Sequence, residues 1–311
     1  MRLVFLGTPF FAVPTLEAII AAGYEVAAVF TQPDRPKGRG QAIAMSPVKE
    51  SALRLGAPVY QPERVRRPEV VEQLAQLKPD AMVVVGYGQI IPQSIIDIPP
   101  HGIINVHASL LPKYRGAAPI QWAIANGETR TGVTTMRIDA GLDTGDMLLK
   151  EETEIGAEED ALRLGPRLSD MGATLLVDTL RGLEAGTITP EPQNSADATL
   201  APILKKEDGR VDFAWRSEKI FNRARGFLPW PGAYTTFRGQ LFHIWKCRPA
   251  DASAREPGRI FAERRRLYAS AGEGTSLELL EIQIEGRKRV SAADFLNGVR
   301  LSDNESFGVD L

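Results

Sequence analysis

The first 150 residues alternate short apolar runs with stretches of helical periodicity, and this alternation constrains the fold more than any other feature of the chain. We expect strands at the apolar runs, which are residues 3–6, 25–30, 58–60, 81–85 and 102–106. Helical patterns fill the gaps between them, at residues 14–22, 47–55 and 68–77. Strands that are apolar throughout and alternate with helices are typical of a parallel sheet covered on both faces. The sequence therefore predicts an α/β domain built on a doubly wound, Rossmann-like sheet.

The pattern changes after about residue 207, where short runs with strand character follow one another with turns between them. We expect one helix at 217–225 and strands at 233–238, 241–246, 259–261, 267–270 and 277–285. The alternation of the last strand is broken at Leu280, which predicts a shift of register there. Several short strands joined by turns indicate a small barrel or sandwich.

Two further stretches connect these regions. Residues 158–184 have a long helical pattern, and residues 186–206 are rich in Pro, Thr and Ser without a clear period. We therefore expect a first domain at 1–185, a linker at 186–206 and a second domain at 207–311. A length of 311 residues suits two domains, at roughly 100–200 residues each.

Composition disfavours several classes of protein. The single cysteine, Cys247, allows neither an intrachain disulfide nor a zinc site with several thiolates. Because the chain has only three histidines, we do not expect a His-rich metal centre. No apolar run approaches the roughly 18 residues of a membrane-spanning helix. The apolar start is broken at Gly7-Thr8-Pro9, and no cleavage pattern follows it. We expect a cytoplasmic protein whose chemistry needs neither a thiol nor a metal.

The turn after the first strand also disfavours nucleotide cofactors. Gly7-Thr8-Pro9 differs from the dinucleotide fingerprint, which has three glycines at G-x-G-x-x-G spacing. The chain has neither a G-x-x-x-x-G-K-[ST] phosphate loop nor a G-x-S-x-G nucleophile elbow. A direct group transfer without a covalent enzyme intermediate fits the sequence better.

The densest group of polar residues lies at the carboxyl end of the strand expected at 102–106. Asn105 and His107 are two residues apart, so the strand period of two places both side chains on one face. Open α/β sheets bind ligands at this edge. An amide and an imidazole suit a developing oxyanion on a carbonyl carbon. The alternative is that Asn105 caps the loop and His107 is a satisfied core residue.

A second polar site is the loop 139–146, in which aspartates alternate with glycines. A carboxylate from this loop beside an imidazole would orient the ring and tune its pKa. The alternative is a plain turn between strands expected at 133–138 and 147–150, because Asp and Gly are ordinary turn residues. The spacing does not match a calcium-binding EF-hand loop.

The net charge of −2 conceals a local basic region. Residues 31–67 contain eight Lys and Arg against three Asp and Glu, and several of the cations lie in a Gly- and Pro-rich loop. Such a loop either contacts phosphates or is a solvated surface loop. The region from residue 207 carries 17 basic and 15 acidic residues. Its aromatic side chains either stack on bases or belong to the core.

These sites resemble the signatures of the folate-dependent formyltransferases. The segments similar to the two family signatures are 105–107, 109–112, 115–119 and 141–146. The segments similar to the inserted loop and C-terminal domain of the members that act on tRNA are 30–40, 46–49, 206–210, 225–226 and 229–233. The resemblance extends from Met1 to about residue 300, so it covers nearly the whole chain.

The resemblance implies an α/β fold in which a Rossmann-like formyltransferase domain is followed by a small OB-like β-barrel domain that binds tRNA. It implies transfer of the formyl group of 10-formyltetrahydrofolate, the co-substrate, to the amino group of methionine on initiator tRNA. The catalytic residues it implies are Asn105, His107 and Asp143. The folate site it implies is lined by Ser109, Leu110, Leu111 and Pro112. The tRNA contacts it implies are Arg35, Lys37, Arg39 and Lys206. We expect a monomer.

Three other functions share parts of this pattern. A formyltransferase with a small acceptor would share residues 102–146 but would have less need of the basic loop and the second domain. A hydrolase that deformylates the folate is a further enzymatic alternative. A non-enzymatic RNA-binding protein would have no need of the trio Asn105, His107 and Asp143.

Overall fold

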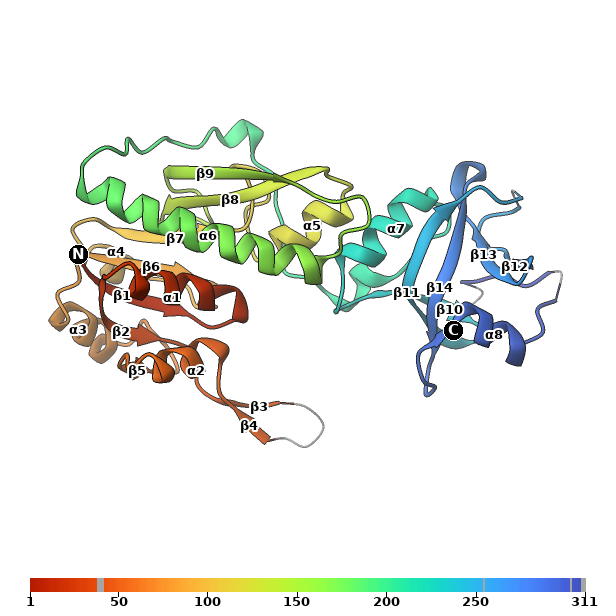
Figure 1. Cartoon of the computed structure of the whole chain (residues 1–311), viewed down its shortest axis with the longest axis horizontal. Helices are drawn as coiled ribbons and strands as arrows, with labels where there is room; N and C mark the ends of the chain where they lie inside the picture. The colour runs from red at the N-terminus through yellow and green to blue at the C-terminus, as the bar shows by residue number, and fades with distance from the viewer. Residues whose placement is uncertain (38–41, 254, 303, 309–311) are drawn as a thin grey trace. The chain divides into compact units, whose positions relative to one another are not determined.

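Figure 1 shows the computed structural model of the chain, which describes residues 1–37, 42–253, 255–302 and 304–308. The chain divides into two compact units. The first unit consists of residues 1–116, 130–154 and 165–201, and the second unit consists of residues 117–129, 155–164 and 202–311. Each unit is described here by itself.

The first unit contains a mixed sheet that is parallel over most of its width. Within the described residues it has seven strands, in the order β5 (Val59–Tyr60), β2 (Glu25–Phe30), β1 (Arg2–Gly7), β6 (Ala81–Val85), β7 (Ile103–His107), β8 (Arg130–Arg137) and β9 (Met147–Glu154). Strands β5 to β7 pair in parallel, whereas β8 and β9 are antiparallel to their neighbours. The predicted α/β class and Rossmann-like sheet are confirmed. Strand β9 is antiparallel to β8 because the loop 138–146 between them leaves no room for a crossover.

The order of the strands fixes where a ligand can bind. The chain passes from β1 to β2 on one side and later returns to β6 on the other side of β1. This reversal is the topological switch point at which open α/β sheets bind ligands, beyond the carboxyl ends of the strands. The centre of the sheet is apolar, since every residue of β6 is buried and so are Leu3 to Leu6 of β1. Strand β7 is the neighbour of β6, so its carboxyl end lies at the same edge.

Alongside its sheet, the first unit contains several helices. They are α1 (Val13–Ala21), α2 (Pro47–Arg54), α3 (Pro68–Gln76), the short α4 (Gln93–Ile96) and most of α6 (Ala161–Glu184). Ser46 caps α2, because its side chain accepts a hydrogen bond of 3.1 Å from the backbone N–H of Lys49. No helix among the described residues is long and apolar enough to cross a membrane.

The basic loop carries two short antiparallel strands that its Gly and Pro content did not predict. They are β3 (Arg35–Lys37) and β4 (Ala42–Ala44), with Pro36 opposite Ile43. Proline is tolerated here because a two-stranded ribbon has only edge strands. Residues 38–41, and with them the predicted tRNA contact Arg39, lie outside the described residues.

The second unit contains an antiparallel sheet. Its strands run in the order β10 (Ala233–Phe237), β11 (Gln240–Ala250), β14 (Ser276–Ile284), β13 (Arg266–Ser270) and β12 (Ile260–Glu263), and β15 (Val290–Ser291) pairs with β14. The predicted small β domain is confirmed. The register between β11 and β14 shifts where Lys246 lies opposite Glu281 and Cys247 opposite Leu279, which leaves Leu280 unmatched. The shift predicted at Leu280 is therefore present as a β-bulge.

Among the described residues, three α-helices lie wholly within this unit. They are α5 (Pro119–Ala125), α7 (Ser217–Gly226) and α8 (Ala292–Gly298), of which only α7 was predicted. Helices α5 and α7 pack closely. A Cβ on Gly226 of α7 would lie 2.8 Å from the backbone nitrogen of Ala125 of α5. The ring of Trp122 packs edge-on against that of Phe227, with centroids 5.2 Å apart.

Candidate active site

The structure brings the three predicted catalytic residues together at the carboxyl end of β7. Asn105 and His107 lie on that strand, and Asp143 lies in the loop between β8 and β9. The Nδ2 of Asn105 donates to Oδ1 of Asp143 at 3.4 Å. The Nδ1 of His107 lies 3.7 Å from Oδ2 of the same carboxylate. One carboxylate thus faces both residues, which the period of β7 places on one face.

A backbone carbonyl orients the ring of His107. Its Nε2 lies 2.9 Å from the carbonyl oxygen of Tyr114. A carbonyl oxygen can only accept, so Nε2 carries a proton and donates it to this bond. The remaining ring nitrogen, Nδ1, is the one that faces Asp143. The imidazole is buried, yet this second nitrogen is available for chemistry with the carboxylate and a substrate.

The carboxylate of Asp143 is held by a loop of unusual conformation. Asp143 has a φ of 50°, in the left-handed region that few residues other than glycine adopt. The backbone N–H of Gly116 donates to Oδ2 of Asp143 at 2.8 Å. Gly145 allows close approach of the loop, because a Cβ there would lie 2.0 Å from the carbonyl oxygen of Arg137. Strain at such a position persists only where the surroundings hold it, and it is concentrated at functional sites.

The predicted folate residues form the loop that follows β7. Ser109 and Leu111 are buried, whereas Leu110 and Pro112 are partly exposed. The hydroxyl of Ser109 donates to the carbonyl oxygen of Lys113 at 2.6 Å. Leu111 packs in a small cluster with Met136 of β8 and Met147 of β9. Ser109 and Leu111 therefore shape the loop from inside, and only Leu110 and Pro112 of this set reach the surface.

The predicted tRNA contacts lie on different elements. Arg35, on β3, is exposed and lies 3.7 Å from a carboxylate oxygen of Glu63. The backbone of Lys37 ends the same strand. Lys206 is exposed at the start of a 3-10 helix (Lys206–Gly209) in the second unit.

Gln193, a polar residue beside the loop that carries Asp143, was not predicted from the sequence. The side chain of Gln193 contacts both the loop that carries Asp143 and the buried Arg115. Arg115 was noted only as part of a family signature. Gln193 lies in the stretch without periodicity, where no pattern in the sequence distinguishes it from its neighbours.

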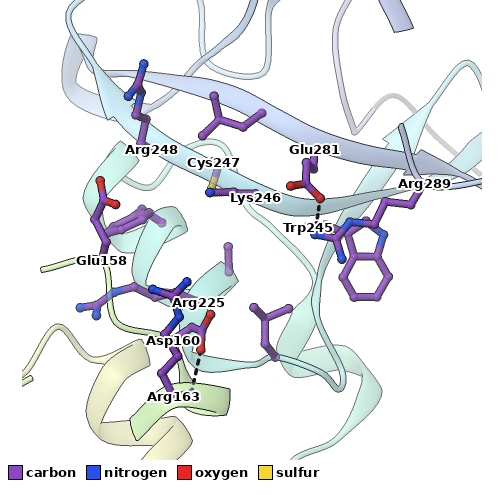
Figure 2. Close-up of a pocket in the computed structure, with 14 residues that line it drawn as sticks. Glu158, Asp160, Arg163, Arg225, Trp245, Lys246, Cys247, Arg248, Glu281 and Arg289 are labelled. Carbon is purple, nitrogen blue, oxygen red and sulfur yellow. Dashed lines mark hydrogen bonds and ion pairs between the residues drawn. The ribbon is translucent and has the colours of Figure 1, made fainter. Parts of the chain in front are cut away.

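A cavity of about 380 Å³ lies in the second unit, away from the predicted site residues (Figure 2). Its charged lining residues are Glu158, Asp160, Arg163, Arg225, Lys246, Arg248, Glu281 and Arg289. Its wall includes Cys247, whose pKa is raised to about 12 by burial. This thiol is therefore protonated at neutral pH and unreactive. Among the described residues, no group of three or more His, Cys, Asp or Glu could hold a metal ion.

Comparison with known proteins decides the family. The formyl transferase family profile matches residues 1–180, and that of the formyl transferase C-terminal domain matches residues 203–300. The chain is 69% identical over 309 residues to the methionyl-tRNA formyltransferase of Solibacter usitatus, covering 99% of both chains. It is 60% identical to the methionyl-tRNA formyltransferase of Koribacter versatilis, again over 99% of both chains. The chain belongs to the methionyl-tRNA formyltransferase family.

Solved structures agree with membership of the methionyl-tRNA formyltransferase family at the level of the fold. An N-formyltransferase from Helicobacter canadensis, crystallised with folinic acid and dTDP-3-aminofucose, is 19% identical with a TM-score of 0.67, covering 90% of this chain and 98% of that one. Glycinamide ribonucleotide transformylase 1 from Symbiobacterium toebii is 19% identical with a TM-score of 0.53, covering 62% of this chain and 94% of that one. These structures share the fold, and the resemblance that the sequence motifs carry is confirmed by the family profiles and the relatives of high identity.

Proposed function

We propose that this chain transfers the formyl group of 10-formyltetrahydrofolate to the free amino group of methionine on initiator Met-tRNA. The observation that carries this function is the arrangement of Asn105, His107 and Asp143 around one point at the carboxyl end of β7. Identity of 69% and 60% to methionyl-tRNA formyltransferases, over 99% of the chain in each case, supports the acceptor.

The reaction needs a stabilised oxyanion. The neutral amine of methionine attacks the formyl carbon, which becomes tetrahedral while its oxygen becomes negative. Asn105 Nδ2 is a donor for that oxygen, and His107 is a second donor once its Nδ1 is also protonated, because its Nε2 is already bonded to the Tyr114 carbonyl. Hydrogen-bond donors placed where charge develops are usually the largest single contribution to such a reaction.

The reaction also moves a proton. A bond forms between the methionine nitrogen and the formyl carbon, and the bond from that carbon to the folate nitrogen breaks. The amine loses one proton, and the leaving folate nitrogen gains one. Asp143 is the carboxylate that orients His107 and carries this proton, because it lies within reach of both site residues and is partly open to solvent, with its side chain 18% exposed.

The remaining assignments belong to the same proposal. Ser109, Leu110, Leu111 and Pro112 form the wall of the folate site, and Arg35, Lys37, Arg39 and Lys206 contact the phosphates of the tRNA. The domains are 1–185 and 207–311 with the linker 186–206, and the protein is a cytoplasmic monomer without a metal. The exposed position of Arg35 and Lys206 supports phosphate contacts, which position a nucleic acid without reading its sequence.

The test is a direct comparison of formyl acceptors. Labelled formyl from 10-formyltetrahydrofolate is offered to charged Met-tRNA, free methionine, glycinamide ribonucleotide and an amino sugar nucleotide. We expect label on Met-tRNA and none on the small amines. Transfer to a small amine at a comparable rate would contradict the proposed acceptor, and release of free formate without transfer would indicate a hydrolase.

A further inference from the structure

Gln193 connects the loop that carries the Asp143 carboxylate with the segment that contains Gly116, whose backbone N–H donates to that carboxylate. The side-chain nitrogen of Gln193 donates to the carbonyl oxygen of Asp143 at 2.9 Å and to that of Gly145 at 2.8 Å. Its side-chain oxygen accepts a hydrogen bond of 2.9 Å from Nε of Arg115. Both donor positions of this amide are therefore used on the Asp143 loop, and its oxygen accepts from the segment that contains Gly116.

The chain around Gln193 is fixed to the same two segments through its backbone. Glu191 and Met147 exchange two backbone hydrogen bonds, of 2.8 and 2.9 Å. On the other side, Arg115 donates its N–H to the carbonyl oxygen of Thr199 at 2.9 Å and accepts from Ala201 at 2.7 Å. Residues 191–201 thus hold Gln193 in place from both ends, although they form no regular helix or strand longer than a 3-10 turn.

The Asp143 loop needs such support. A φ of 50° at Asp143 lies in the left-handed region, and such a conformation is maintained by the contacts that surround it. Gly116 N holds the side chain, and Gln193 is the group that holds the carbonyl.

Gln193 also acts on Gly116 through its contact with Arg115, the preceding residue. Arg115 is only 7% exposed, and its Nη2 has no hydrogen-bond partner among the described residues. Without Gln193 its Nε would lose its partner as well, and a buried guanidinium with two unpaired nitrogens would have to move. Gly116, the next residue, would move with it.

We propose that Gln193 is a positioning residue for the transfer reaction, which holds the carboxylate of Asp143 against Asn105 and His107. This inference rests on the proposed function, because it assigns Gln193 an effect on the step that Asp143 serves. It predicts a loss in kcat with little change in KM, since Gln193 itself contacts no substrate. A displacement of about 1 Å in a catalytic group can lower a rate by around a hundredfold.

Two substitutions separate this role from a plain structural one. Gln193→Leu removes every hydrogen bond of the side chain. Gln193→Glu keeps the length and strengthens the contact with Arg115, but it places a carboxylate against two carbonyl oxygens. Asn194→Ala is the matched control, because the Asn194 side chain bonds within its own exposed turn, to Ala196 N and Asp197.

Kinetics and amide exchange are measured together on the full chain. We expect kcat to fall by about ten- to a hundredfold in Gln193→Leu and at least as far in Gln193→Glu, with KM for both substrates within about twofold. Hydrogen exchange in residues 139–146 should be faster in both variants and unchanged in Asn194→Ala.

Other results would overturn the inference. A Gln193→Glu enzyme as active as the wild type would mean that the residue serves only to pair Arg115. A loss confined to KM, or unchanged exchange at 139–146 in both Gln193 variants, would also overturn it. A wild-type protein that transfers no formyl group would instead refute the proposed function, and the exchange data would still decide whether Gln193 holds the loop.

Discussion

Replacing Asp143 by asparagine removes the negative charge from the site while keeping the shape of the side chain. The carboxylate accepts from Gly116 N at 2.8 Å and from Asn105 Nδ2 at 3.4 Å. An amide keeps the shorter bond through its oxygen and gives up the longer one. That loss is about 1 kcal/mol of stability at most, or roughly 2–4 °C in melting temperature. Asparagine also tolerates the φ of 50° at this position.

The effect on the reaction should be far larger than the effect on stability. Asparagine cannot take the proton from the attacking amine, and general acid–base catalysis contributes about a hundred- to ten-thousandfold in rate. This corresponds to about 2.7–5.4 kcal/mol in the barrier. The assay is single-turnover transfer of labelled formyl to Met-tRNA at saturating enzyme, with thermal melting as the control. A rate within threefold of wild type in a folded Asp143→Asn enzyme would refute the role of Asp143.

The structure supports three further predictions, and the sequence resemblance supports a fourth, at Arg39. Asn105→Ala should lower the single-turnover rate by about a hundred- to a thousandfold through loss of one oxyanion donor, and a rate near wild type would contradict that role. Arg39→Ala should raise the KM for tRNA far more than the KM for folate, and the difference should shrink at high salt. An equal loss of activity toward a free amine acceptor would count against the tRNA contact. Gly116→Ala should destabilise the protein by about 1–3 kcal/mol, measured by thermal melting, because its Cβ would lie 2.6 Å from the Ala201 carbonyl oxygen at a φ of 122°. Because burial penalises the thiolate and raises the pKa of Cys247 to about 12, this thiol should resist alkylation at pH 8 until the chain unfolds, and rapid labelling of the folded protein would contradict its burial.

The sheet of the first unit could be predicted because its strands are apolar throughout and its helices carry local signals. Strand β6 is buried at every position, and Ser46-Pro47 marks the start of α2. The bulge at Leu280 was also visible, since it breaks a period of two. Helix α5 was not predicted, because its apolar run Pro119–Ala125 is short and adjoins the loop of a family signature.

The candidate site could be predicted only in part. The spacing of Asn105 and His107 placed both on one face of a strand, but it left a core histidine as the simpler alternative. The approach of Asp143 to Asn105 and His107 depends on its positive φ and on the hydrogen bond that its carboxylate accepts from Gly116 N. Gly116 and Asp143 are 27 residues apart in the sequence. The contribution of Gln193 is longer in range still, 50 residues from Asp143, and it comes from a segment without any periodic pattern. Contacts of this kind are set by the tertiary fold, so no local rule finds them.

The central claim is that the site formed by Asn105, His107 and Asp143 formylates methionine on initiator tRNA. The measurement that tests it most directly is transfer of labelled formyl from 10-formyltetrahydrofolate to initiator and elongator Met-tRNA side by side, with wild type and Asp143→Asn. We expect rapid labelling of initiator Met-tRNA by the wild type, slower labelling of the elongator, and loss of both in the variant. Equal labelling of the two tRNAs would contradict the assigned substrate, and equal rates for the two enzymes would contradict the assigned site.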